Sequence, residues 1–351
     1  MLNFTTFKIY IALDSNFKIM KKLFIFFTAV CLQTISFAQD AKQLQEKART
    51  FMHQGDFPNA ILVLNRALAL EPNNLEIAKD LGLNYYYSKD YNKAVEVLKP
   101  LLDRNDADDQ CFQIAGDAYW ALDQTKECEA VYKKGIKKLP NSGALYNELG
   151  KVLWTNKDFT AIKQWEKGIE NDPGFAGNYY NACKYYYFTT DKVWSLIYGE
   201  IFLNIDPKSA YTPEIKNILV EGYKKLFADA DLEKNSKDKN PFTIAFLKTM
   251  NKQSSIAASG INAESLTMIR TRFILDWYTT YAAKFPFKLF ALQQQFLQDG
   301  LFEAYNQWVF ATTQNLPAYQ NWTTAHPKEY NELTRFLEGR IFKVPKGQYY
   351  H

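Results

Sequence analysis

Between about residues 41 and 207 the sequence repeats itself with a period close to 34 residues. Small residues recur in steps of 34, 34, 34 and 33, at Ala48, Gly82, Gly116, Gly150 and Cys183. Large apolar residues follow three positions later, at Phe51, Tyr85, Tyr119, Leu153 and Tyr186. A second small series has the same rhythm, at Ala60, Ala94, Cys128, Ala161 and Ser195, and prolines 72, 140, 173 and 207 close four of the units. Such self-similarity predicts a stack of equal supersecondary units.

Each unit has the pattern of two helices joined by a short turn. In the first unit the apolar residues Leu44, Ala48 and Phe51 have helical spacing, and Gly55-Asp56 then breaks the helix. A second apolar stripe of helical spacing follows from Phe57 to Leu68. Two antiparallel helices approach closely only where their side chains are small, so Ala48 is expected to face Ala60. In the second unit we expect the second helix to bend or end early at Pro100.

With these markers the chain resembles the tetratricopeptide repeat proteins. The resemblance implies an all-α, right-handed superhelical solenoid of about five helical hairpins over residues 41–207. It also implies that the first helices of successive hairpins line a concave face, on which an extended peptide or a partner helix is held. The first two units match best, and the fifth matches least.

From residue 208 onward the 34-residue rhythm fails, and the segment resembles no family that we can name. Its pattern still predicts helices, over about 214–229, 242–252, 263–283, 291–298, 302–312 and 327–342. The charged stretch 231–241 is the predicted linker. Residues 287–317 are either a degenerate sixth hairpin or an ordinary helix pair. We expect the many aromatic residues of 208–351 to pack against the end of the solenoid as a cap.

The N-terminus has the layout of a secretory signal peptide. Met20-Lys21-Lys22 is a basic start, residues 23–35 are apolar, and Ser36-Phe37-Ala38 precedes a cleavage point before Gln39. A short membrane anchor or a buried helix is the alternative. We therefore expect removal of residues 1–38, with Met20 as the true start, and export to the periplasm of a Gram-negative bacterium or beyond the cell. After cleavage no membrane insertion is expected.

Charge and cysteine content give little indication of a specific chemistry. Without residues 1–38, Lys+Arg falls from 42 to 38 and Asp+Glu from 38 to 37, which leaves a formal charge of +1. A nearly neutral chain has no electrostatic footprint for nucleic acid. Cys111, Cys128 and Cys183 are expected to act as small buried residues, although a Cys111–Cys128 bridge is an alternative.

The search for catalytic chemistry finds no candidate. His53, His326 and His351 are far apart, and there is no metal-ligand spacing, nucleophile elbow, phosphate-binding loop or dinucleotide fingerprint. The sequence therefore predicts no enzyme, no metal and no cofactor. A hydrolase or transferase with an unrecognised site in 208–351, which uses the repeats to recruit substrate, is the alternative.

One series on the first helices indicates where a partner is held. It directly follows the large apolar packing series, so it lies about 100° further round each helix. Its members are Met52, Tyr86, Trp120, Trp154 and Tyr187. The polar neighbours expected on the same face are Arg49, Lys79, Asn147, Lys151, Asn181 and Lys184. Asn181 is expected to pair with a partner's backbone, and Lys151 with Lys184 to hold an acidic side chain. Packing between neighbouring helices is the alternative role for the aromatic series.

These patterns favour a non-catalytic scaffold that binds a protein or peptide segment in a concave groove. Large aromatic side chains dominate protein interfaces because they bury much surface at low entropic cost. Stacking of two copies through the N-terminal repeat is a third hypothesis. The oligomeric state and the identity of the partner do not follow from the sequence.

Overall fold

The structure, a computed structural model, describes residues 40–229, 231–233 and 240–351, and within these ranges every regular element is a helix. The predicted all-α fold is thus confirmed. The predicted leader at 1–38 and most of the predicted linker lie outside the described residues. Within the described ranges no helix has both the length and the apolar character that crossing a membrane requires.

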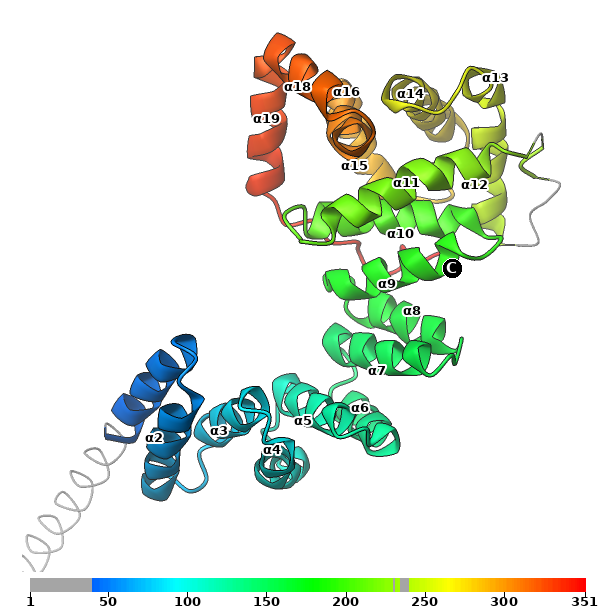
Figure 1. Cartoon of the computed structure of the whole chain (residues 1–351). Coiled ribbons are helices and arrows are strands. Elements are labelled where there is room, and N and C mark those ends of the chain that lie inside the picture. Colours follow the sequence, from blue (N-terminus) through cyan, green and yellow to red (C-terminus); the bar gives the residue numbers. More distant parts are fainter. Residues whose placement is uncertain (1–39, 230, 234–239) are drawn as a thin grey trace, which may run out of the picture. The chain divides into compact units, whose positions relative to one another are not determined.

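The chain packs as two compact units, which meet between Val131 and Tyr132, inside helix α6 (Thr125–Lys138). In the first unit, residues 40–53 form a helix that packs on α2 (Phe57–Leu70). α3 (Leu75–Tyr87) and α4 (Tyr91–Leu98) form the second hairpin, and α5 (Asp109–Ala121) begins the third (Figure 1). Consecutive helices from α2 to α5 pack on one another, as the 34-residue period predicts.

The turn inside each hairpin has the same backbone conformation in four successive units. Gly55, Lys89, Asp123 and Lys157 have φ angles of 75°, 64°, 59° and 61°, and they are spaced 34 residues apart. Glycine adopts this left-handed conformation without strain, whereas other residues do so at a cost. Three of the four turns therefore keep the geometry without the glycine that would mark them in the sequence.

Small residues in the first helix make room for large side chains of the second helix. A Cβ atom on Gly82 would lie 2.5 Å from Cγ of Leu98, and one on Gly150 would lie 2.6 Å from Cδ1 of Trp165. Leu98 and Trp165 each lie one helical turn beyond the small residue that the sequence places opposite. The close approach of the helices is as expected, but in these two hairpins the residue that fills the contact is large.

Pro100 ends the second helix of the second repeat hairpin, as predicted. The α-helix α4 stops at Leu98, and the chain continues as a 3₁₀-helix, η1 (Lys99–Asp103). Proline has no N–H to donate and its ring clashes with the preceding turn of an α-helix.

The second compact unit, which begins at Tyr132, contains the last repeats and then helices of a different arrangement. α7 (Gly143–Thr155) with α8 (Ala161–Asn171) and α9 (Ala176–Tyr187) with α10 (Lys192–Ile205) form the fourth and fifth hairpins. α11 (Thr212–Leu226) packs on α9 and α10. The remaining helices are α12 (Pro241–Asn251), α13 (Ser254–Ala257), α14 (Ala263–Thr280), α15 (Lys288–Gln298), α16 (Phe302–Asn306), the π-helix η2 (Gln307–Ala311), α17 (Thr312–Gln314), α18 (Leu316–Ala325) and α19 (Pro327–Glu338).

Most predicted helices of the C-terminal segment are present, with two differences. The sequence prediction missed α18, which Asn315 caps by accepting a hydrogen bond from the Ala318 N–H at 3.0 Å. The last helix ends at Glu338 instead of about Phe342, and residues 340–351 form a non-helical tail. The division at 207/208 and the degenerate sixth hairpin stay predictions.

The core of this unit combines aromatic rings with one buried ion pair. Phe242 of α12 stacks on Trp194 of α10 with ring centroids 5.6 Å apart, so the aromatic residues pack against the repeats as expected. The buried Glu200 accepts hydrogen bonds from Arg270, from Gln293 at 2.7 Å and from Tyr305 at 2.9 Å. A buried charge is tolerated when it is paired and hydrogen-bonded in this way.

Candidate functional site

The predicted partner-binding residues lie on the first helices of the hairpins in each of the two units. On α7, Asn147, Lys151 and Trp154 have i, i+4, i+7 spacing, which places them on a single stripe. Arg49 and Met52 have the equivalent places on the helix at residues 40–53, and Trp120 has the place of Trp154 on α5. The aromatic member falls in the last turn of its helix. The stripe thus has a polar part in the first half of each helix and an aromatic part next to the hairpin turn.

In the first unit, the polar part of the stripe consists of two groups of paired polar side chains, one around Asp80 and one around Lys79. Asp80 of α3 accepts hydrogen bonds from Arg49 at 3.0 Å and from the buried Gln45 at 2.7 Å. Lys79 pairs with Asp108 and with Glu76. Burial alone would lower the pKa of Lys79, but these hydrogen bonds outweigh it and raise the pKa. The two groups link α3 to the helices on both sides, so these charges hold neighbouring repeats together.

The aromatic part of the first unit is partly open to solvent. The Met52 sulfur lies 3.6 Å from the Asn84 amide, and the Tyr86 ring packs on Tyr91 with centroids 5.6 Å apart. Trp120 is the most open member of the series in this unit, with 39% of its surface exposed. Such a side chain in a folded protein offers a large apolar area that is still free to be buried.

In the second unit, an amide pair links two successive repeats. The Asn181 side chain donates a hydrogen bond to Oδ1 of the buried Asn147 at 2.8 Å and another to the Gly177 carbonyl at 3.1 Å. Asn147 in turn donates to Glu148 at 3.0 Å. The Asn181 Oδ1 has no hydrogen-bond partner among the described residues. It is therefore an oriented acceptor, fixed by the two bonds that its own amide nitrogen donates.

The predicted pair of lysines is already neutralised within the chain. Lys151 lies 2.6 Å from Glu148, and Lys184 lies 2.8 Å from Glu214 of α11. The Tyr180 hydroxyl also donates to Glu214, at 2.6 Å, and accepts from Lys184 at 3.0 Å. Both ion pairs are exposed, and pairs of this kind contribute at most about 1 kcal/mol. Their role in holding an acidic side chain stays a prediction.

Trp154 is the centre of an aromatic group on the second unit. Its ring lies 5.7 Å from Phe159 and 5.7 Å from Tyr185, and 38% of its surface is exposed. The sequence prediction missed Phe159 and Phe188, which are 63% and 71% exposed beside hairpin turns. Phe159 follows Tyr91 by two 34-residue periods and Phe188 follows Trp154 by one, so periodicity marks both positions but does not show that they are exposed.

The stripe ends at α11. Lys225 of α11 places its ammonium group 3.6 Å from the centre of the Tyr187 ring, and the ammonium group of Lys192, the first residue of α10, lies 5.9 Å from the same centre. A cation over an aromatic face is attracted by it. Tyr187 is therefore covered by its own chain, and Trp154 is the last widely exposed member of the series.

Metal-binding clusters and reactive thiols are two common bases of catalytic chemistry. Among the described residues, no group of three or more His, Cys, Asp or Glu side chains is placed to bind a metal. Cys111, Cys128 and Cys183 are buried and none of them forms a disulfide, so the alternative of a Cys111–Cys128 bridge is wrong. Burial raises the pKa of Cys111 and of Cys183 to about 12, which keeps both as thiols.

Two buried polar sites of the second unit lie away from the stripe, namely the Glu200–Arg270 ion pair and Lys216. The cavity beside Glu200 and Arg270 has a volume of about 10 Å³, the size of a single water. Lys216 lies with its Nζ 4.0 Å from the centre of the Trp308 ring and 3.2 Å from Oγ1 of Thr312. Burial lowers the pKa of Lys216 to about 7.

Comparisons with known proteins find similarity over parts of the chain. The family described as anaphase-promoting complex, cyclosome, subunit 3 matches residues 53–135. BBSome complex member BBS4 from Bos taurus is 32% identical over 112 residues, which are 32% of this chain and 21% of that protein. The Mus musculus protein of the same name is 30% identical over the same shares of both chains. The chain thus spans about a fifth of the length of these curated relatives.

Two solved structures illustrate the similarity in three dimensions. The crystal structure of MamA is 24% identical and has a TM-score of 0.39, covering 46% of this chain and 95% of that one. A tetratricopeptide repeat protein from Parabacteroides merdae ATCC 43184 is 15% identical and has a TM-score of 0.41, covering 73% of this chain and 99% of that one.

Proposed function

We propose that this chain is a non-catalytic scaffold of the tetratricopeptide repeat type that holds a segment of a partner protein on the first-helix stripe. The observation that carries the proposal is the pair Trp120 and Trp154. They are one repeat apart, occupy the same position on α5 and α7, and are 39% and 38% exposed. Aromatic side chains that are neither buried nor charged are the usual anchors of protein interfaces.

The polar part of the stripe offers the partner segment a hydrogen-bond acceptor. The Asn181 Nδ2 donates hydrogen bonds to Asn147 and Gly177, which fix the side chain so that its Oδ1 can accept a hydrogen bond. A backbone N–H of an extended segment is a suitable donor, because extended chains have unpaired backbone groups. Apolar side chains of the same segment would then pack on Trp154 and its neighbours Phe159 and Tyr185.

Because the charged residues of the stripe are already paired, we expect the partner segment to be apolar and uncharged in its central part. Arg49, Lys151 and Lys184 each have an acidic partner within the chain. Capture of a charged side chain would exchange one exposed ion pair for another, with little net gain. Affinity in this proposal therefore comes from aromatic burial, and salt has only a weak effect on it.

A set of three variants tests this proposal. Trp120→Ala, Trp154→Ala and the double variant remove the anchors, and Tyr330→Ala on α19 is the control, because Tyr330 is 37% exposed but lies outside the repeats. Each Trp truncation is expected to cost about 1–2 kcal/mol, a loss of roughly 5- to 30-fold in affinity for a captured partner. Circular dichroism checks that the variants are folded. Equal capture by the double variant and by the control would refute the proposal.

We also propose that the chain acts outside the cytoplasm after removal of residues 1–38. The support is the basic, apolar and small-residue order of residues 20–38. N-terminal sequencing of the protein from its native host is expected to begin at Gln39. A mature protein that begins at Met1 or at Met20 would contradict this proposal.

A further inference from the structure

Residues 340–351 cross the second unit as a non-helical strap that is fixed at both ends. Phe342 and Val344 are buried at one end. At the other end the Tyr350 ring stacks on Phe242 with centroids 4.7 Å apart, and its hydroxyl donates to the Pro286 carbonyl at 2.6 Å. The strap is therefore a fixed wall of the unit.

Between these two ends the strap turns away from the helices. Gln348 donates its N–H to the Pro345 carbonyl at 3.2 Å, which closes a turn with Gly347 at a φ of 84°. A positive φ at the third residue of such a turn is the position where glycine is favoured. Pro345, Lys346 and Gly347 are exposed, so the turn arches over the surface and contributes no side chain to the core.

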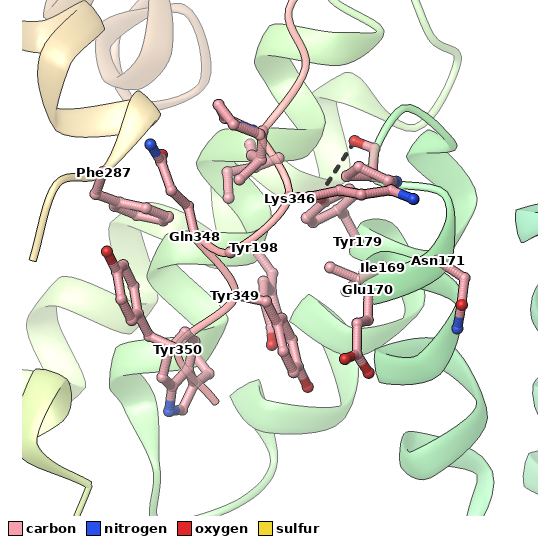
Figure 2. Close-up of a pocket in the computed structure, with 16 residues that line it drawn as sticks. Ile169, Glu170, Asn171, Tyr179, Tyr198, Phe287, Lys346, Gln348, Tyr349 and Tyr350 are labelled. Carbon is pink, nitrogen blue, oxygen red and sulfur yellow. Dashed lines mark hydrogen bonds between the residues drawn. The ribbon is translucent and has the colours of Figure 1, made fainter. Parts of the chain in front are cut away.

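A cavity of about 310 Å³ lies under this arch (Figure 2). Its walls are the end of α8 with the residues that follow it, one side of α9 and α10, Phe287, and residues 344–350 of the strap. This volume is at the lower end of the range for small-molecule sites, about 300–1,000 Å³. It suits a compound the size of an amino acid and is too small for a protein segment of several residues.

The interior of the cavity is aromatic and rigid. Tyr179, Trp194 and Tyr198 line it and are each at least 98% buried. Their rings pack on one another, with centroids 5.9 Å apart for Tyr179 and Tyr198 and 5.4 Å apart for Trp194 and Tyr198. Burial raises the pKa of Tyr179 and of Tyr198, so both remain neutral phenols. The walls are thus preformed for an apolar ring or alkyl group.

Trp194 and Tyr198, which line the cavity, each have a buried polar atom without a hydrogen-bond partner among the described residues. The indole Nε1 of Trp194 has no hydrogen bond within the described part of the chain. A buried donor without an acceptor costs about 1–3 kcal/mol. An acceptor atom brought in by a ligand would remove this cost.

Two opposite charges stand at the edge of the cavity. Glu170 and Lys346 both line it, and neither forms an ion pair or hydrogen bond with the rest of the described chain. In Figure 2, Lys346 extends above Tyr179, Glu170 lies below it, and Tyr349 stands on the opposite side of the gap. The cavity thus combines one free anion, one free cation and an aromatic interior.

We propose that the cavity under the 345–348 turn binds a small zwitterion with an apolar body, of the class of free α-amino acids with a ring side chain. The ring lies among Tyr179, Tyr198 and Tyr349, where burial of apolar surface favours binding. The ammonium group lies toward Glu170 and the carboxylate toward Lys346, so each rim charge gains a partner. This site does not include Trp120 or Trp154, so it stands or falls independently of the partner-binding stripe.

Calorimetric titration of the full chain tests the proposal with three related compounds. L-phenylalanine carries both charges, N-acetyl-L-phenylalanine lacks the ammonium group, and L-phenylalanine amide lacks the carboxylate. We expect saturable binding of L-phenylalanine and a loss of about two- to fivefold in affinity for each analogue, since exposed ion pairs have this strength. Equal binding of all three, or no saturable binding of any up to about 10 mM, would overturn the proposal.

Variants locate the binding at the rim of this cavity. Glu170→Gln is expected to weaken L-phenylalanine but not the N-acetyl compound, and Lys346→Gln is expected to weaken L-phenylalanine but not the amide. Lys343→Gln is the control, because Lys343 is an exposed lysine of the same strap that does not line the cavity. All three side chains are exposed, so the substitutions leave the core intact. Unchanged affinity in both rim variants would assign the binding elsewhere and overturn the proposal.

Discussion

Replacing Gly150 by alanine tests how closely the two helices of a repeat approach. Gly150 lies on α7 against the Trp165 ring of α8, and an added Cβ would lie 2.6 Å from Cδ1 of that ring. Real carbon atoms do not approach so closely without movement. Trp165 is only 2% exposed, and its indole N–H donates to the Asn147 carbonyl at 3.3 Å, so the ring has little freedom to move aside.

The magnitude follows from three contributions. Overpacking of a close contact costs about 1–3 kcal/mol. Displacement of the indole leaves its buried N–H without an acceptor, which costs about another 1–3 kcal/mol. Alanine is favoured over glycine in a helix by about 1 kcal/mol, which offsets part of this loss. We therefore expect Gly150→Ala to lower the free energy of unfolding by roughly 1–5 kcal/mol.

Urea denaturation followed by circular dichroism measures this difference, with Gly174→Ala as a matched control. Gly174 is also near the fourth hairpin, but a Cβ there would meet its nearest atom, Oδ1 of Asp172, at an ordinary 3.7 Å. The control is expected to change stability by less than about 1 kcal/mol. If Gly150→Ala is as stable as Gly174→Ala, the proposed contact between α7 and α8 is wrong.

Two further predictions concern single lysines. Burial lowers the pKa of Lys216 to about 7 from 10.5, so above pH 7 the unfolded chain binds a proton that the folded chain lacks, and stability rises with pH. From pH 7 to about pH 9 the free energy of unfolding should rise by about 2 kcal/mol, and Lys216→Met should remove this rise; a slope that persists in the variant would contradict the assignment. Lys157 has a φ of 61°, so Lys157→Gly should stabilise by about 0.5–1 kcal/mol, whereas Lys163→Gly inside α8 should destabilise by about 1 kcal/mol in the same thermal melts. Equal shifts of both glycine variants would refute strain at the turn.

The repeats could be predicted because their signals are local and recur. Pro100 ends α4 as expected, since proline acts on its own turn of helix whatever surrounds it. The turn residues Lys89 and Lys157 were harder to identify, because their left-handed backbone is imposed by the hairpin and not by glycine. They follow Gly55 by one and by three periods of 34 residues, and this spacing is the signal that identifies them.

The C-terminal segment was harder to predict because distant residues determine it. Pro317 resembles the proline that closes a repeat, yet it stands in the first turn of α18, where proline is favoured after the capping Asn315. The strap has no periodicity at all. It is placed by contacts such as the one between Tyr350 and Phe242, more than 100 residues apart in the chain.

The candidate stripe stays a prediction, and the structure adds how its charges are paired. The spacing of Trp120 and Trp154 places them at equivalent positions on α5 and α7. The ion pairs Lys151–Glu148 and Lys184–Glu214 have no periodic signal in the sequence. The second of them joins α9 to α11, which lies beyond the repeats. Sequence alone does not show that these charges are already satisfied.

The most direct test of the scaffold proposal is site-specific photocrosslinking in the native host. A photoreactive phenylalanine analogue replaces Trp120, Trp154 or, as the control, Tyr330, whose exposure is similar at 37%. We expect one shared partner band at Trp120 and Trp154 and none at Tyr330. Mass spectrometry should then place both crosslinks on a short apolar segment of that partner. A partner that crosslinks at Tyr330 and at neither tryptophan would contradict the account.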